Sequence, residues 1–214
     1  GMVPPPPPPP HPTLSSSAGL GAIADKYVEE IRRRMDAVGD ARGWRGDGDD
    51  VVLRVVDKEP GNWLNVGFIR LLFPDARIIY TDRDVLDTTV SVFTQHFMVL
   101  QSRSLEHIAR TIVAIKRLLR FWEEDVNVPM LKVDYEDLIN DFEEQARRIV
   151  EYVGLPWHDA CLHFHRNKRK VDTPSRNQVN RPIYNSSVGR WRRFERYLQP
   201  AMAVFDDARA WGDI

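Results

Sequence analysis

The stretch RIIYTDRDVLDTTVS, residues 77–91, decides how the rest of the chain is organised. Its β-branched run Ile78–Tyr80 predicts a buried strand, and the polar residues that follow predict a turn. Apolar residues then recur at intervals of three and four, which predicts a helix over 85–97. Asp84 stands at the N-cap position of this helix, and Asp87 suits its positive end. The stretch therefore predicts a strand, a tight turn and a helix.

Arg83 lies in that turn, where it suggests an anion-binding site. A helix N-terminus beside a guanidinium binds phosphate well. Ser91 follows about two helical turns later, roughly 12 Å along the axis, so that both side chains can reach one anion. The alternative is that Arg83 pairs with the neighbouring carboxylates and that Ser91 binds nothing. The stretch alone leaves both interpretations open.

The composition of the 214 residues narrows the class of protein. Hydrophobic residues make up 43%, enough for a substantial core, and the net charge of −1 gives no reason to expect nucleic acid as a partner. The single Cys161 excludes an intramolecular disulfide and a cysteine-based zinc site. Its reduced state fits a cytoplasmic protein. No apolar run approaches the ~20 residues of a membrane span, so no membrane partner is expected.

Charge is concentrated in the C-terminal third. Residues 163–197 contain ten Lys or Arg and two acidic residues, a net charge of +8, whereas the remainder has 20 basic and 29 acidic residues, a net charge of −9. A basic segment on an acidic body suggests an anionic ligand at the junction. The alternative is that the basic segment packs against acidic helices of its own chain.

Residues 1–23 are expected to form a disordered Pro/Ser-rich leader, and residues 24–214 an α/β domain. Periodicity predicts helices over 24–38, 63–73, 85–97, 105–122, 139–153, 157–165 and 190–210, the last interrupted near Pro200. Apolar runs predict strands over 51–56, 78–81 and 130–133, and residues 166–189 read as an ordered loop. This alternation predicts a parallel sheet with helices on both faces.

Each predicted strand ends in a polar residue with a long side chain. Lys58, Arg83 and Tyr135 follow the three strands in turn. Because ligands of parallel sheets bind beyond the carboxyl ends of the strands, these three side chains are expected to converge on one crevice. Two cations and a phenol suit a nucleotide phosphate better than a metal ion or an acyl group.

Several motifs together resemble the sulfotransferases that use 3′-phosphoadenosine 5′-phosphosulfate, in particular bacterial enzymes associated with tetratricopeptide repeats and the similar tyrosylprotein sulfotransferases. The resemblance runs from about residue 24 to 200. Its elements, in chain order, are Asp57-Lys58-x-Pro60-x-Asn62, Phe73-Pro74-x-Ala76-Arg77, Arg83-Asp84-x-x-Asp87-x-x-x-Ser91, Tyr135-Glu136-Asp137-Leu138, Gly154-Leu155-Pro156-Trp157 and a tail from Thr173 to Trp191.

The resemblance implies a sulfotransferase fold similar to that of P-loop NTPases and a site for the sulfate donor or for adenosine 3′,5′-bisphosphate. Arg83 and Ser91 would bind the 3′-phosphate, Tyr135 would lie near adenine, and Lys58 near the bridging oxygen or sulfuryl group. The residues that would close over the nucleotide are Ser187, Gly189, Arg190 and Trp191.

Local alternatives to these roles remain. For Lys58 the alternative is an ion pair with Asp57 or Glu59. For Tyr135 it is an ordinary place in the core, and for Trp191 it is a role as a packing anchor.

One departure from the family concerns the N-terminus. Family members begin with a strand and a loop of the type Pro-Arg-Ser-Gly-Thr that holds the 5′-phosphosulfate, and nothing before Ala24 matches it. The chain therefore resembles an N-terminally truncated member, expected to be weakly active or inactive alone. An open sheet edge would favour homo-oligomers or aggregation. No catalytic base is assigned, because Glu59 and His96, the nearest candidates, both suit structural roles better.

Two functions follow from these residues. The first is transfer of a sulfuryl group from the nucleotide donor to a hydroxyl or amine, with the acceptor itself undetermined. The second is a non-catalytic nucleotide- or polyanion-binding module that uses the basic C-terminal third. Loss of nucleotide binding on substitution of Arg83 and Ser91 distinguishes the first from the second.

Overall fold

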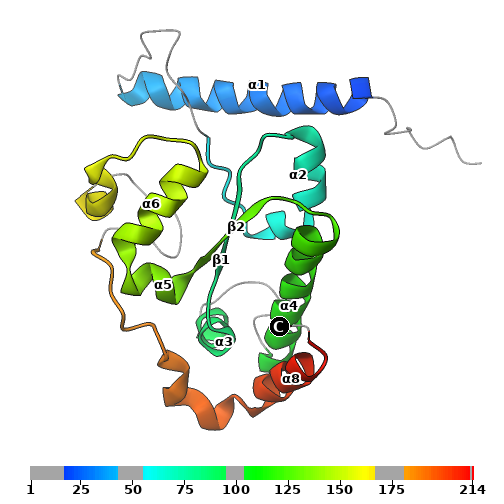
Figure 1. Ribbon diagram of the computed structural model, residues 1–214, viewed down its shortest axis with the longest axis vertical. Helices are drawn as coiled ribbons and strands as arrows, with labels where there is room; N and C mark the ends of the chain where they lie inside the picture. The colour runs from blue at the N-terminus through cyan, green and yellow to red at the C-terminus, as the bar shows by residue number, and fades with distance from the viewer. Residues whose placement is uncertain (1–16, 43–54, 95–103, 167–180, 213) are drawn as a thin grey trace, which may run out of the picture. The chain divides into compact units, whose positions relative to one another are not determined.

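The computed structural model describes residues 17–42, 55–94, 104–166, 181–212 and 214 (Figure 1). The chain divides into two compact units, Gly1–Ala76 and Arg77–Ile214. The second unit contains the stretch 77–91 and the basic tail, so most of the predicted site residues belong to it.

The secondary-structure elements described in the N-terminal unit are all helices. Its elements are the α-helix α1 (Ser17–Arg42), the 3₁₀-helix η1 (Pro60–Leu64) and the α-helix α2 (Val66–Leu72). Helix α1 begins before the predicted start at residue 24, within the segment expected to be flexible. The strand predicted over 51–56 is wrong at Val55 and Val56, which are exposed and have no strand partner within the described ranges, while 51–54 lie outside them.

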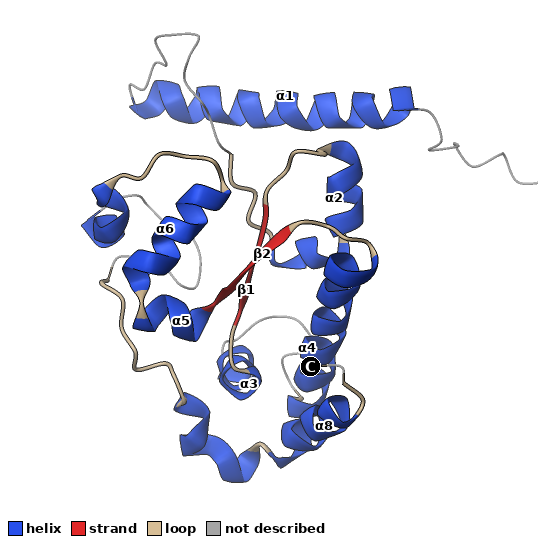
Figure 2. Cartoon of the chain, in the orientation of Figure 1, coloured by secondary structure: helices blue, strands red, loops and turns tan. Residues whose placement is uncertain are grey.

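The second unit is built on a parallel pair of strands, β1 (Ile78–Asp82) and β2 (Met130–Asp134). They pair in register from Ile78 opposite Met130 to Asp82 opposite Asp134. A helical crossover joins them (Figure 2), because parallel neighbours cannot be connected by a hairpin. The described elements of the crossover are α3 (Val85–Thr94), α4 (Leu105–Arg120) and the π-helical turn η3 (Phe121–Asp125). The α/β class and the parallel sheet predicted from the sequence are confirmed.

In the part of the chain that the structure describes, five helical segments follow β2. They are α5 (Tyr135–Asn140), α6 (Phe142–Tyr152), the 3₁₀-helices η4 (Asp159–Arg166) and η5 (Arg190–Tyr197), and α8 (Gln199–Ala210). The helix predicted over 139–153 is therefore longer and divided at Asp141. The helix predicted over 190–210 breaks at Leu198, and Pro200 instead lies in the first turn of α8. Proline is tolerated there because the first N–H groups of a helix have no partner within the helix.

The main hydrophobic core lies between α3, α4 and α8. Ala109, Ala201 and Phe205 are fully buried in it, together with Leu86 and Val90 of α3. Figure 1 shows α4 and α6 on opposite sides of the strands, as expected for a parallel sheet. The core packing fixes α3 against the C-terminal helices and so brings residues 83–91 close to the tail. No helix in the described ranges is both long and apolar enough to span a membrane.

Candidate functional site

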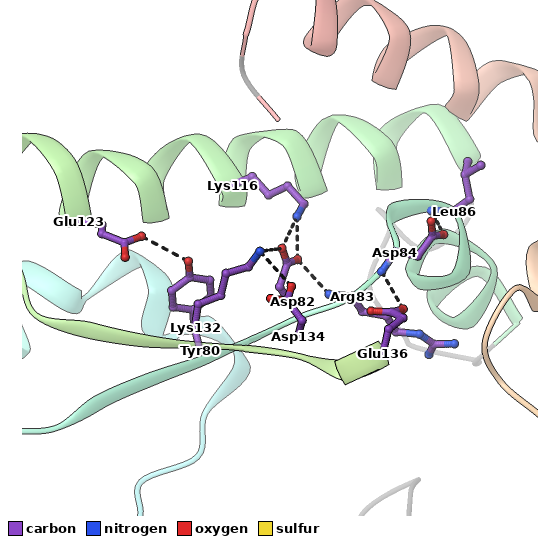
Figure 3. A network of polar contacts seen from close by, with 10 residues as sticks. All are labelled: Tyr80, Asp82, Arg83, Asp84, Leu86, Lys116, Glu123, Lys132, Asp134 and Glu136. Atoms are coloured by element: carbon purple, nitrogen blue, oxygen red, sulfur yellow. Dashed lines mark hydrogen bonds and ion pairs between the residues drawn. The ribbon is translucent and has the colours of Figure 1, made fainter. Parts of the chain in front are cut away.

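The turn between β1 and α3 is capped by Asp84, as predicted. Its Oδ1 accepts hydrogen bonds from the N–H groups of Leu86 at 3.0 Å and Asp87 at 2.8 Å. The N–H of Asp84 in turn donates to Glu136 Oε1 of α5 at 3.2 Å (Figure 3). The first amides of α3 therefore already have carboxylate partners, which leaves the side chain of Arg83 as the stronger anion ligand at this turn.

Arg83 is held on three sides by groups from distant segments. Its Nη2 donates to the Ser187 carbonyl oxygen and lies 3.9 Å from Asp87 Oδ2. Its guanidinium carbon lies 4.7 Å from the centroid of the Tyr135 ring, a cation–π geometry. The Nε atom is buried and has no hydrogen-bond partner among the described residues. The guanidinium is thus fixed in place while one of its donors is unused.

Tyr135 is the first residue of α5 and lies at the carboxyl end of β2, where the sequence predicted it. Burial raises the pKa of its phenol, although the Arg83 charge and a hydrogen bond to the Ser187 side chain act to lower that pKa. The phenol therefore stays protonated at neutral pH. The ring is only half-buried, and its place near adenine stays a prediction.

Asp87 joins α3 to the tail. Its side chain is completely buried, with Oδ2 accepting the N–H of Gly189 at 2.6 Å and Oδ1 the N–H of Trp191 at 2.8 Å. Gly189 has φ +67°, a left-handed conformation that favours glycine. This function of Asp87 was not predicted from the sequence. The signal for it was the position of Asp87 three residues before Val90, on the apolar side of a helix, because a carboxylate buried there needs a hydrogen-bond donor.

The remaining tail residues differ in their surroundings. Trp191 is half-buried against the main core, and the guanidinium of Arg192 lies 5.1 Å from its ring, which supports the packing-anchor alternative. Arg190 is exposed. Ser91 is half-buried on α3, one turn beyond Asp87, so that positions 87 and 91 follow one side of the helix, and Arg83 in the turn before the helix contacts the tail through Ser187. The predicted phosphate ligands Arg83 and Ser91 therefore lie on the side that contacts the tail.

A second polar cluster fixes the end of β1 (Figure 3). Asp82 accepts two hydrogen bonds from Lys116 of α4, at 2.6 and 2.8 Å, and lies 3.2 Å from the Lys132 ammonium. It also accepts the N–H of Arg83 at 2.9 Å. Burial alone would raise the pKa of Asp82, but Lys116, Arg83 and Lys132 outweigh it and lower that pKa. Asp82 is therefore a stable anion that holds the backbone at Arg83.

Two of the predicted residues belong to the N-terminal unit, and a third lies outside the described residues. Lys58 belongs to the N-terminal unit, is exposed, and has no ion pair within the described part of the chain. Its neighbour Asp57 instead accepts the Tyr27 hydroxyl at 2.6 Å. Glu59 caps η1 by accepting the N–H of Gly61, a structural role, and His96 lies outside the described residues. The role of Lys58 in transfer stays a prediction.

Comparison with known proteins identifies similar chains. The sequence model of the sulfotransferase family matches residues 23–159, more than half of the chain. An uncharacterized protein of Aquifex aeolicus is 35% identical over 159 residues, 72% of this chain and 21% of that protein. Protein-tyrosine sulfotransferase A of Caenorhabditis elegans is 26% identical over 147 residues, 64% of this chain and 38% of that enzyme. Protein-tyrosine sulfotransferase of Drosophila melanogaster is 24% identical over 157 residues, 64% of this chain and 30% of that enzyme. The matched regions span less than two-fifths of each relative.

Proposed function

Because this chain belongs to the sulfotransferase family, we propose that it binds 3′-phosphoadenosine 5′-phosphosulfate and serves transfer of its sulfuryl group to a hydroxyl or amine acceptor. The observation that carries the proposal is the buried, unused Nε of Arg83 in a guanidinium otherwise fixed by Ser187 and Tyr135. A phosphate oxygen is the partner that such a donor suits best.

Each proposed role rests on the chemistry of the residue. Arg83 and the Ser91 hydroxyl hold the 3′-phosphate of the nucleotide. The half-exposed ring of Tyr135 offers a stacking surface for adenine, and Ser187, Gly189, Arg190 and Trp191 form the segment beside it. Lys58 remains the candidate for the charge that develops on the leaving phosphate, because an ammonium stabilises an oxyanion directly.

Sulfuryl transfer demands mainly positioning and charge stabilisation. The donor nucleotide supplies the activated sulfuryl group, and the protein has to hold it in line with the acceptor oxygen or nitrogen. Arg83 is suited to holding the nucleotide because its backbone and side chain are restricted by four neighbours: Asp82, Asp87, Tyr135 and Ser187. A residue fixed before the nucleotide arrives loses little conformational entropy when it binds.

We expect the isolated chain to bind the nucleotide without appreciable turnover. None of the described residues is assigned to hold the 5′-phosphosulfate. Measurable sulfate transfer from the donor to a phenolic acceptor would contradict this part of the proposal and show that other residues hold the 5′ group.

Titration with adenosine 3′,5′-bisphosphate tests the nucleotide site. Arg83→Ala should abolish measurable binding, Arg83→Lys should weaken it because the ammonium loses the fork geometry, and Ser91→Ala should weaken it about tenfold. Arg209→Ala is the matched control, since Arg209 is exposed on α8 and pairs only with Asp206 among the described residues. Equal binding by Arg83→Ala and Arg209→Ala variants refutes the site.

The exposed arginines of η5 support a second candidate, a polyanion-binding module. Arg190, Arg192, Arg193 and Arg196 all expose their side chains on one short helix. Titration with a sulfated polysaccharide at rising salt tests it, because binding by surface charges weakens steeply as salt screens them. A triple Arg192→Ala, Arg193→Ala, Arg196→Ala variant that loses this binding while keeping the nucleotide would establish two separate activities.

A further inference from the structure

One buried carboxylate connects two parts of the chain that are far apart in sequence. Asp87 accepts backbone hydrogen bonds from Gly189 and Trp191, which follow it by 102 and 104 residues. One donor is the N–H of Gly189, the N-cap residue of η5, and the other is the N–H of Trp191 in the first turn of that helix. Gly189 has no side chain with which to accept a hydrogen bond from that first turn. The side chain of Asp87 therefore takes the place of a capping side chain for a helix to which Asp87 does not belong.

The same carboxylate lies beside the guanidinium assigned to the phosphate. Asp87 Oδ2 is 3.9 Å from Arg83 Nη2, and that nitrogen donates to the carbonyl of Ser187, two residues before Gly189. Residues Ser187–Trp191, here called the tail segment, are thus held at one end by Arg83 and at two further points by Asp87. Arg83 and the tail segment consequently form one unit whose geometry depends on Asp87.

We propose that Asp87 is a positioning residue that fastens the tail segment against Arg83 and so assembles the two halves of the nucleotide site before ligand binds. The proposal rests on the proposed function for its ligand. Its structural half, the fastening, stands on the hydrogen bonds alone and can be tested without any nucleotide.

The Asp87→Asn variant distinguishes a positioning role of Asp87 from a purely electrostatic one, because loss of the first should weaken nucleotide binding and loss of the second should tighten it. Removing a negative charge 3.9 Å from Arg83 should by itself tighten binding of a phosphate. The asparagine amide, in contrast, turns one acceptor into a donor that faces a backbone N–H, which releases the tail segment. Since a charge-assisted hydrogen bond is lost, we expect binding of adenosine 3′,5′-bisphosphate to weaken about tenfold.

The first measurement is hydrogen–deuterium exchange of the free protein, read on peptides that contain Gly189 and Trp191. The amides of the tail segment should exchange about tenfold faster in Asp87→Asn, while peptides from the α4 and α8 core keep their protection. Asp84→Asn is the matched control, because it removes a charge three residues earlier and Asn caps helices as well as Asp. Its tail segment should exchange as in the unaltered chain.

The second measurement is calorimetric titration with adenosine 3′,5′-bisphosphate and with adenosine 5′-monophosphate. Because Arg83 is assigned to the 3′-phosphate, Asp87→Asn should reduce the ratio of the two affinities, which general destabilisation would not change. Tighter binding of the bisphosphate by Asp87→Asn would overturn the proposal in favour of a purely electrostatic role. Unchanged exchange of the tail segment would overturn the fastening itself.

The exchange and titration measurements test the role of Asp87 separately from the proposed function. If the unaltered chain binds neither nucleotide but Asp87→Asn still releases the tail segment, the nucleotide site is wrong and the fastening is right. If the unaltered chain binds the bisphosphate and Asp87→Asn leaves both exchange and affinity unchanged, the function stands and Asp87 has no positioning role.

Discussion

Two carboxylates on either side of Arg83 are satisfied in different ways. Asp82, at the end of β1, is partly exposed and bonded mainly to the ammonium groups of Lys116 and Lys132. Asp87, in α3, is fully buried and bonded to backbone amides of a segment about a hundred residues away. Lysine side chains can return to water when their partner is lost, whereas the partly buried backbone amides of Gly189 and Trp191 are held in place by the fold. The structure therefore predicts that Asp87 contributes more to stability and tail position than Asp82.

Asp87→Ala is expected to have the largest effect. It leaves the partly buried N–H groups of Gly189 and Trp191 without an acceptor, and a buried group left unpaired costs about 1–3 kcal/mol. We expect the free energy of unfolding, measured by urea denaturation, to fall by about 3 kcal/mol or more. Asp82→Ala, the matched control, should cost about 1 kcal/mol because its lysines become solvated. A larger loss for Asp82→Ala would reverse the comparison.

Gly189→Ala tests the tail side of the same contact. At φ +67° any side chain is strained, and a Cβ would lie 2.1 Å from Arg192 Nη1, the flexible end of a side chain that can move away. We expect a loss of about 1–2 kcal/mol in urea denaturation, most of it from the backbone. Gly61→Ala is the control, since Gly61 has no positive φ and a Cβ added there would lie 3.9 Å from Glu59 Oε1, an ordinary van der Waals contact. Adding Arg192→Ala should restore little if backbone strain dominates.

The local elements around Arg83 could be predicted from the sequence because their signals are local. The strand, the Asp84 cap and the start of α3 are all encoded within residues 77–91 by β-branched residues, a capping residue and helical spacing. The parallel strand at 130–134 followed from the same alternation of elements. Predictions of this kind need no knowledge of distant contacts.

The contacts that assemble the site were not predictable in the same way. The bond from Asp87 to Gly189 depends on packing of α3 against η5 and α8, which no local pattern encodes. The interruption predicted near Pro200 falls at Leu198, and Pro200 itself lies in the first turn of α8, where proline is tolerated. The strand expected at 51–56 failed at Val55 and Val56 because an apolar run also needs a pairing neighbour.

The pH dependence of stability gives a third, smaller effect, centred on Asp82. Burial opposes ionisation, but Lys116 and its neighbours lower the pKa of this carboxyl below its usual value of about 3.9. A lowered folded pKa means that its stabilisation is present above about pH 4 and is lost as pH falls through the folded pKa. The stability difference between the unaltered chain and Asp82→Asn, about 1 kcal/mol at pH 7, should therefore vanish in acid. A constant difference down to about pH 2 would show that the Asp82 charge is not what stabilises the strand end.

Tyr80 provides the smallest effect and extends the comparison to alkaline pH. Burial, followed by the Glu123 charge, raises the pKa of its phenol to about 12, and its hydroxyl donates to Glu123 Oε2 at 3.3 Å. A raised folded pKa means that the stabilisation is complete below the unfolded value of about 10 and is lost as pH rises towards 12. Because the side chain is partly exposed, we expect Tyr80→Phe to reduce this alkaline loss by less than about 1 kcal/mol. The absorbance of tyrosinate, followed in parallel with unfolding, checks the raised pKa of Tyr80. If Tyr80 ionises at the pH of an exposed tyrosine, its contact with Glu123 does not stabilise the strand end, and Asp82 alone anchors that region.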